Sequence, residues 1–127
     1  MKFNHENLKV YQRSLNFIEF TNKIFNDNSY RMDVYDQLDR ASSSIPLNIA
    51  EGTGKFTGKD KCRYYDIARG SALECAACLD TLLKRNRISG TINEEGKSIL
   101  IEVVSMLIGL LKSNSDRVYE DIPEYET

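Results

Sequence analysis

Apolar residues recur at alternating steps of three and four over four long stretches of the chain, a spacing that is typical of amphipathic helices. In the first stretch, Leu8, Tyr11 and Leu15 begin one such stripe. The pattern predicts helices over about residues 6–25, 31–51, 58–86 and 92–114. A chain of 127 residues fits one domain, so we predict an all-α bundle at residues 1–115 followed by a C-terminal tail at residues 116–127.

Residues with known preferences for helix ends mark several of these boundaries. Residues 52–54 read Gly-Thr-Gly, which is typical of the end of a helix. Thr57 with Asp60, and Thr91 with Glu94, have the spacing of a capping box. We therefore expect the two threonines to cap the third and fourth helices.

The first and last predicted helices carry more apolar surface than one bundle buries. A second apolar stripe runs along the first helix, and residues 99–111 of the last helix are interrupted only by Glu102, Ser105 and Gly109. A four-helix bundle buries about a third to a half of the circumference of each helix. We therefore predict that these two helices pack against neighbouring subunits in a homo-oligomer.

Charge is distributed unevenly along a chain whose net charge is −2. Residues 116–127 contain five acids and one base, a net of −4, and subtracting this from −2 leaves +2 for residues 1–115. The body of the protein is therefore mildly basic and the tail acidic. So small a net charge creates no strong field toward nucleic acid or anionic lipid.

No stretch of the sequence indicates export or insertion into a membrane. The N-terminal residues contain no apolar signal-peptide core, and the most apolar run, residues 99–111, is too short to span a bilayer. Three cysteines are an odd number, which favours free thiols in a reducing compartment. We therefore expect a cytoplasmic protein with no membrane partner.

Residue types that carry catalysis or bind metals are sparse. His5 is the only histidine, and no cluster of metal ligands stands near it in the sequence. Cys75 and Cys78 have CxxC spacing, but they fall in the middle of a predicted helix, whereas redox-active pairs lie at a helix N-terminus. The sequence has no glycine-rich phosphate loop and no histidine suited to a nucleophilic triad. We expect no enzymatic activity, no catalytic residue, no metal and no cofactor.

Residues 37–52 combine polar, small and helix-breaking residues in one predicted helix. Steps of four, three and four place four residues on one face of that helix: Arg40, Ser44, Leu47 and Glu51. Pro46 frees the carbonyl one turn before it, so we expect a kink. Asn48 falls on the core stripe, where its side chain needs a partner, either that freed carbonyl or a facing helix. It belongs either to a polar pocket or to a network that fixes the register of the helices.

Four cations surround the start of the third predicted helix, namely Lys55, Lys59, Lys61 and Arg63. In a cyclic oligomer the cluster would repeat around one rim and could meet phosphates, which makes these residues candidates for nucleic-acid binding. On a single subunit, the same four residues fit a solvated surface loop with no binding role equally well.

Two runs of the sequence carry a family resemblance. The first reads Q-L-D-R-A-S-S-S-I-P-L-N-I-A-E-G, and its polar family positions are Gln37, Arg40, Ser44, Asn48 and Glu51. The second reads A-R-G-S-A-L-E over residues 68–74, and its polar family positions are Ser71 and Glu74. Together they resemble the proteins encoded in intervening sequences of bacterial 23S rRNA, also called the S23 family.

This resemblance implies an up-and-down antiparallel four-helix bundle, assembly as a homopentamer and no established enzymatic activity. A related branch, the accessory protein of diversity-generating retroelements, is strongly basic and binds nucleic acid and a reverse transcriptase. The present chain differs from that branch in its net charge and its acidic tail. Two interpretations remain: an oligomeric RNA- or DNA-binding accessory factor, or a scaffold that binds another protein.

Overall fold

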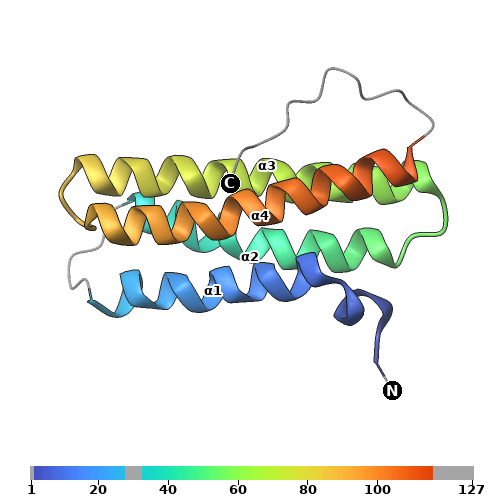
Figure 1. The fold of residues 1–127 in the computed structure, drawn as a ribbon, viewed down its shortest axis with the longest axis horizontal. Coiled ribbons are helices and arrows are strands. Elements are labelled where there is room, and N and C mark those ends of the chain that lie inside the picture. The colour runs from blue at the N-terminus through green and yellow to red at the C-terminus, as the bar shows by residue number, and fades with distance from the viewer. Residues whose placement is uncertain (1, 28–32, 116–127) are drawn as a thin grey trace.

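Four α-helices that lie side by side make up most of the computed structural model (Figure 1), which describes residues 2–27 and 33–115. They are α1 (Lys9–Asp27), α2 (Asp33–Thr53), α3 (Gly58–Lys84) and α4 (Gly90–Asn114), preceded by the short 3-10 turn η1 (Asn4–Asn7). The described residues contain no strand, so the prediction of an all-α chain with four helices is confirmed. No helix in this part of the chain is apolar enough over a sufficient length to cross a membrane. Residues 31 and 32 and the predicted acidic tail, residues 116–127, lie outside the described residues.

The core lies between all four helices, because each helix packs against two others. α2 contacts α3, α3 contacts α4, and α1 contacts both α2 and α4. Each helix contributes fully buried side chains to the centre, among them Phe17, Leu38, Leu79 and Val103. Removing one such side chain from water contributes about 1.5–3 kcal/mol, so the apolar stripes seen in the sequence hold the fold together.

The starts of two helices differ from the prediction. Leu8 is extended, with φ −82° and ψ 129°, so residues 4–7 form a separate turn and α1 begins three residues later than expected. Ser89, not Thr91, caps α4: its side-chain oxygen accepts a hydrogen bond from the Ile92 backbone N–H at 3.1 Å. Since Ser89 already satisfies this N–H group, α4 begins at residue 90 rather than 92. Thr57 caps α3 as predicted.

Two helix ends also differ. α3 ends two residues early because Asn86 adopts the left-handed conformation, with φ 59°. α2 continues to Thr53, so Gly52 lies inside the helix rather than ending it. A Cβ atom on Gly52 would lie 3.0 Å from the Cβ of Tyr64, which shows that the glycine lets α3 approach α2 closely.

Most of the apolar surface of α1 and α4 is covered within the single chain, although Leu15, Ile18 and Ile101 are only half-buried. The packing of these two helices against neighbouring subunits stays a prediction. Gly96 explains how α4 is covered: a Cβ atom there would lie 2.6 Å from Cε2 of Phe20 and 2.7 Å from Cδ1 of Leu79. The absence of a side chain lets α4 sit deeply against α1 and α3, which enclose its apolar sides. The large apolar side chains that remain exposed lie elsewhere, at Phe3, Leu47, Phe56, Ile67 and Leu73.

Candidate functional site

Three residues of the two family runs form one polar network between α2 and α3. The Ser71 hydroxyl donates to Oγ of Ser44 at 2.8 Å, and the Asn48 side-chain amide donates to the backbone oxygen of Ser44 at 2.8 Å and to its Oγ at 2.9 Å. The sequence placed Asn48 in the core, but it is half-buried and Ile49 takes the core position. The Asn48 side chain binds the backbone carbonyl of Ser44, one turn back, and not the carbonyl that Pro46 frees.

The other polar residues of these runs do not join the network. Gln37, Arg40, Glu51 and Glu74 are exposed. Glu51 forms an ion pair with Lys55 at 3.7 Å. An open depression of about 390 Å³ on α2 is lined by Asp39, Arg40, Ser43, Ser44, Leu47 and Asn48. Arg40 therefore lines the same shallow hollow as Ser44 and Asn48 of the polar network.

Exposed apolar side chains flank the polar network on both helices. Leu47, 67% exposed, follows Ser44 by three positions on α2, and Ile67, 46% exposed, precedes Ser71 by four positions on α3. Residues three or four apart are neighbours on a helix surface. The sequence predicts uncovered apolar surface on α1 and α4, and not on this face. Leu47 shares the helix face of Arg40 and Ser44 in the sequence, and this spacing is the signal that points to it.

The four candidate cations divide into two pairs. Lys61 donates from Nζ to the backbone oxygen of Thr53 at 2.9 Å and so caps the end of α2. The Nζ atom of Lys55 lies 5.0 Å from the centre of the Tyr64 ring, in addition to its pairing with Glu51. Both side chains therefore already have partners within the chain.

Lys59 and Arg63, in contrast, are exposed and have no ion-pair partner among the described residues. They lie four positions apart on α3, so they project from adjacent turns of one face. The structure thus leaves two of the four predicted cations available for an external anion.

The C-terminal end of α4 lies against the start of α3. A Cβ atom on Gly58 would lie 2.1 Å from the backbone oxygen of Asn114, and Sγ of Cys62 lies 3.7 Å from the backbone oxygen of Leu111. Lys112, which is exposed, follows Leu111 directly. This third cation was not predictable from the sequence, because its proximity to the start of α3 arises only from the packing of distant segments.

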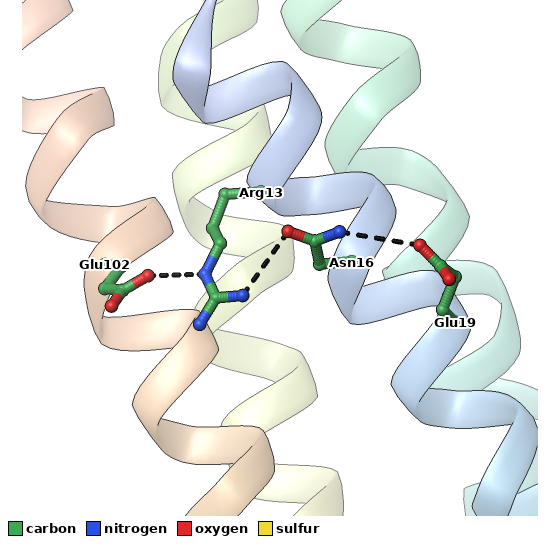
Figure 2. Close-up of polar contacts among 4 residues, drawn as sticks. All are labelled: Arg13, Asn16, Glu19 and Glu102. Atoms are coloured by element: carbon green, nitrogen blue, oxygen red, sulfur yellow. Dashed lines mark hydrogen bonds and ion pairs between the residues drawn. The ribbon is translucent and has the colours of Figure 1, made fainter.

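A chain of polar side chains joins α1 and α4 on the opposite side of the bundle. Arg13 on α1 reaches Glu102 on α4, and it also donates to Asn16, which donates in turn to Glu19 (Figure 2). An open groove of about 530 Å³ runs along this seam. Because Arg13 is matched by Glu102, Lys9 is the one cation lining this groove that has no ion-pair partner among the described residues, whereas the start of α3 has two such cations on adjacent turns.

The CxxC cysteines lie on the buried side of α3. Burial, followed by the neighbouring charges, raises the pKa of the Cys75 thiol well above its ordinary range, and burial followed by the Glu74 charge raises the pKa of Cys78. Both thiols therefore stay protonated at neutral pH and act as small apolar core groups. No group of three or more His, Cys, Asp or Glu side chains in the described residues is arranged to hold a metal ion.

The fold and this site together define a small helical-bundle protein with a polar motif between α2 and α3. The sequence pattern of the 23S rRNA-intervening sequence protein family matches residues 6–109, and the chain belongs to that family. The crystal structure of a protein of unknown function from the S23 ribosomal protein family of Bacteroides thetaiotaomicron is similar, with a TM-score of 0.75 and 24% identity over 81% of this chain and 98% of that chain. This likeness supports the fold. None of the curated proteins matches the chain.

Proposed function

We propose that this protein is a non-enzymatic, self-associating helical bundle that binds the phosphate backbone of RNA or DNA at the end where α2 meets α3. One observation carries the proposal: Lys59 and Arg63 are exposed on adjacent turns with no ion-pair partner among the described residues. Lys112 adds a third exposed cation on the neighbouring helix end. Few cations per subunit give weak binding, so assembly is needed to bring several copies to one nucleic acid.

Within each subunit we infer an up-and-down antiparallel bundle. Two ion pairs support this topology: Arg13 pairs with Glu102, whereas Lys23, further along α1, pairs with Glu95, which comes earlier on α4. The helix ends are joined by short connections, which favour antiparallel neighbours. The free thiols of Cys62, Cys75 and Cys78 fit a reducing cytoplasm.

We propose that subunits associate through the α2–α3 face into a cyclic homo-oligomer, a pentamer by family resemblance. Leu47 and Ile67 expose apolar surface beside the hydrogen-bonded Ser44–Ser71 pair, the combination of apolar anchors and satisfied polar groups found in stable interfaces. The double variant Leu47→Glu/Ile67→Glu should be a folded monomer by light scattering, and Phe3→Glu, a matched change at another exposed side chain, should assemble normally. A monomeric wild-type protein at micromolar concentration would refute the assembly.

Fluorescence anisotropy with a labelled structured RNA at low salt tests the binding function. Lys59→Gln/Arg63→Gln should weaken the binding that the wild-type protein shows, and replacing Lys55 and Lys61 with Gln as well should abolish it. Lys84→Gln/Arg85→Gln removes the same charge from exposed residues at the opposite end of α3 and should bind nearly as well as the wild type. If the wild-type protein shifts neither RNA nor DNA, the binding function is excluded.

A scaffold that binds another protein is the second candidate function. In this alternative a helix of another protein, and not a second subunit, covers the exposed Leu47 and the depression beside Arg40. The two functions separate in one experiment: a wild-type protein that stays monomeric by light scattering and binds no nucleic acid at low salt supports the scaffold.

A further inference from the structure

Phe56 is the most exposed large apolar side chain of the described residues. It lies in the connection between α2 and α3, and its relative exposure is 101%. Phenylalanine is usually buried, and a partner that covers a ring left wholly in water lowers the free energy of the system. The other aromatic residues near this connection, Tyr64 and Tyr65, are half-buried and buried.

The backbone on both sides of Phe56 is fixed by the fold. At the α2 end of the connection, the Thr53 backbone oxygen accepts a hydrogen bond from Nζ of Lys61 at 2.9 Å. At the α3 end, the Thr57 side-chain oxygen accepts one from the Asp60 backbone N–H at 3.1 Å. The connection is therefore anchored three residues before the ring and one residue after it. A partner that covers the ring pays little entropy for ordering the loop.

Uncompensated cations follow this ring closely in the sequence. Lys59 follows Phe56 by three positions, and Arg63 lies one further turn along α3. Asp60 lies in the same first turn, but its position at the helix N-terminus is the usual one for an acid, and the net charge of Lys59, Asp60 and Arg63 stays positive. Lys55 is held over the face of Tyr64 at 5.0 Å, so Phe56 is the ring left open to an outside group.

We propose that Phe56 stacks on an unpaired base of single-stranded nucleic acid while Lys59 and Arg63 contact the adjoining phosphates. This inference rests on the proposed nucleic-acid function and names the form of nucleic acid it takes. An exposed aromatic ring beside backbone-tracking cations is the usual arrangement for single strands, because every base offers a face for stacking. A duplex keeps its bases stacked internally, so it would use the cations and not the ring.

The test is fluorescence anisotropy of the full-length protein with a labelled oligouridine single strand and a labelled RNA duplex at low salt. Phe56→Ala should weaken single-strand binding by about 5- to 150-fold, the range measured for removing one stacking ring, and leave duplex binding unchanged. Phe56→Trp should retain single-strand binding. Phe3→Ala, a matched change at another exposed phenylalanine, should have no effect on either substrate.

The outcomes distinguish the two claims. If the wild-type protein binds neither substrate, the proposed function fails and the inference fails with it. If the wild type binds but Phe56→Ala binds single strands equally well, or loses single strand and duplex equally, the stacking role is refuted while the nucleic-acid function stands. If light scattering shows that Phe56→Ala alters the oligomer, the ring is a subunit contact and the inference is overturned.

Discussion

Ser71 on α3 donates a hydrogen bond to Oγ of Ser44 on α2 at 2.8 Å, and Ser44 in turn accepts from Asn48. Ser71→Ala should therefore lower the free energy of unfolding by about 0.5–1.5 kcal/mol, the usual net value of one such bond.

Asn48→Leu, which removes the other donor to Ser44, should likewise change the stability or the assembly of the protein. Urea denaturation measures the loss, with Ser43→Ala, a neighbouring exposed serine, as the control. A double-mutant cycle of Ser71→Ala with Ser44→Ala that shows strict additivity would contradict a shared network.

Gly96 is required by the close approach of α4 to its neighbours. Gly96→Ala should destabilise the fold by about 1–3 kcal/mol, because the new methyl group would overlap Phe20 and Leu79. Gly109→Ala on the same helix faces open space and should instead stabilise by up to about 1 kcal/mol through helix propensity. Thermal denaturation measures the stability of both variants. Equal changes in melting temperature for Gly96→Ala and Gly109→Ala would show that packing at Gly96 is not tight.

Asp80 should make stability depend on pH in the acidic range. Its carboxylate is hydrogen-bonded mainly by Lys97, at 2.5 Å, and also by Asn93, and this holds its pKa below the ordinary value of 3.8. The contribution is therefore fully present above about pH 4 and is lost as the pH falls through the lowered pKa. Asp80→Asn and Lys97→Met should both reduce the free energy of unfolding at pH 7, and each difference should shrink toward pH 2. A difference that is constant over this range would exclude the linkage.

Deleting residues 116–127 should strengthen nucleic-acid binding. The deletion removes a net charge of −4, and α4 ends against Gly58 beside the exposed Lys59. Removing negative charge close to a phosphate-binding surface lowers electrostatic repulsion. The dissociation constant for RNA, measured at one low salt concentration, should fall relative to the full chain. Weaker binding by the truncated protein would mean that the tail contributes to the interface.

The helical periodicity of the sequence located all four helices, because each must bury an apolar stripe against the others. Exact helix ends were less predictable. Ser89 and Thr91 both fit a cap by residue type, and the choice between them depends on the backbone path into α4. Leu8 fits the helical stripe, yet it is extended and separates the first turn from α1.

The candidate site was predictable as a set of residues but not as an arrangement. Spacing placed Ser44 and Asn48 one turn apart, whereas the partnership with Ser71 depends on how α3 packs on α2. The positions of the Lys59 and Lys61 side chains show the same limit of prediction from sequence. They lie two positions apart in the sequence, and only the fold directs Lys61 to the end of α2 and leaves Lys59 exposed.

The salt dependence of nucleic-acid binding tests the central claim most directly. Each phosphate contact releases counterions, so the logarithm of the association constant should fall linearly with the logarithm of salt concentration. Lys59→Gln/Arg63→Gln should flatten that slope by about 1.4–1.8 for each subunit that engages, from about 0.7–0.9 for each lost contact. Lys84→Gln/Arg85→Gln should leave it unchanged. A wild-type slope near zero, or an equal slope for all three proteins, would contradict binding by the cations at the start of α3.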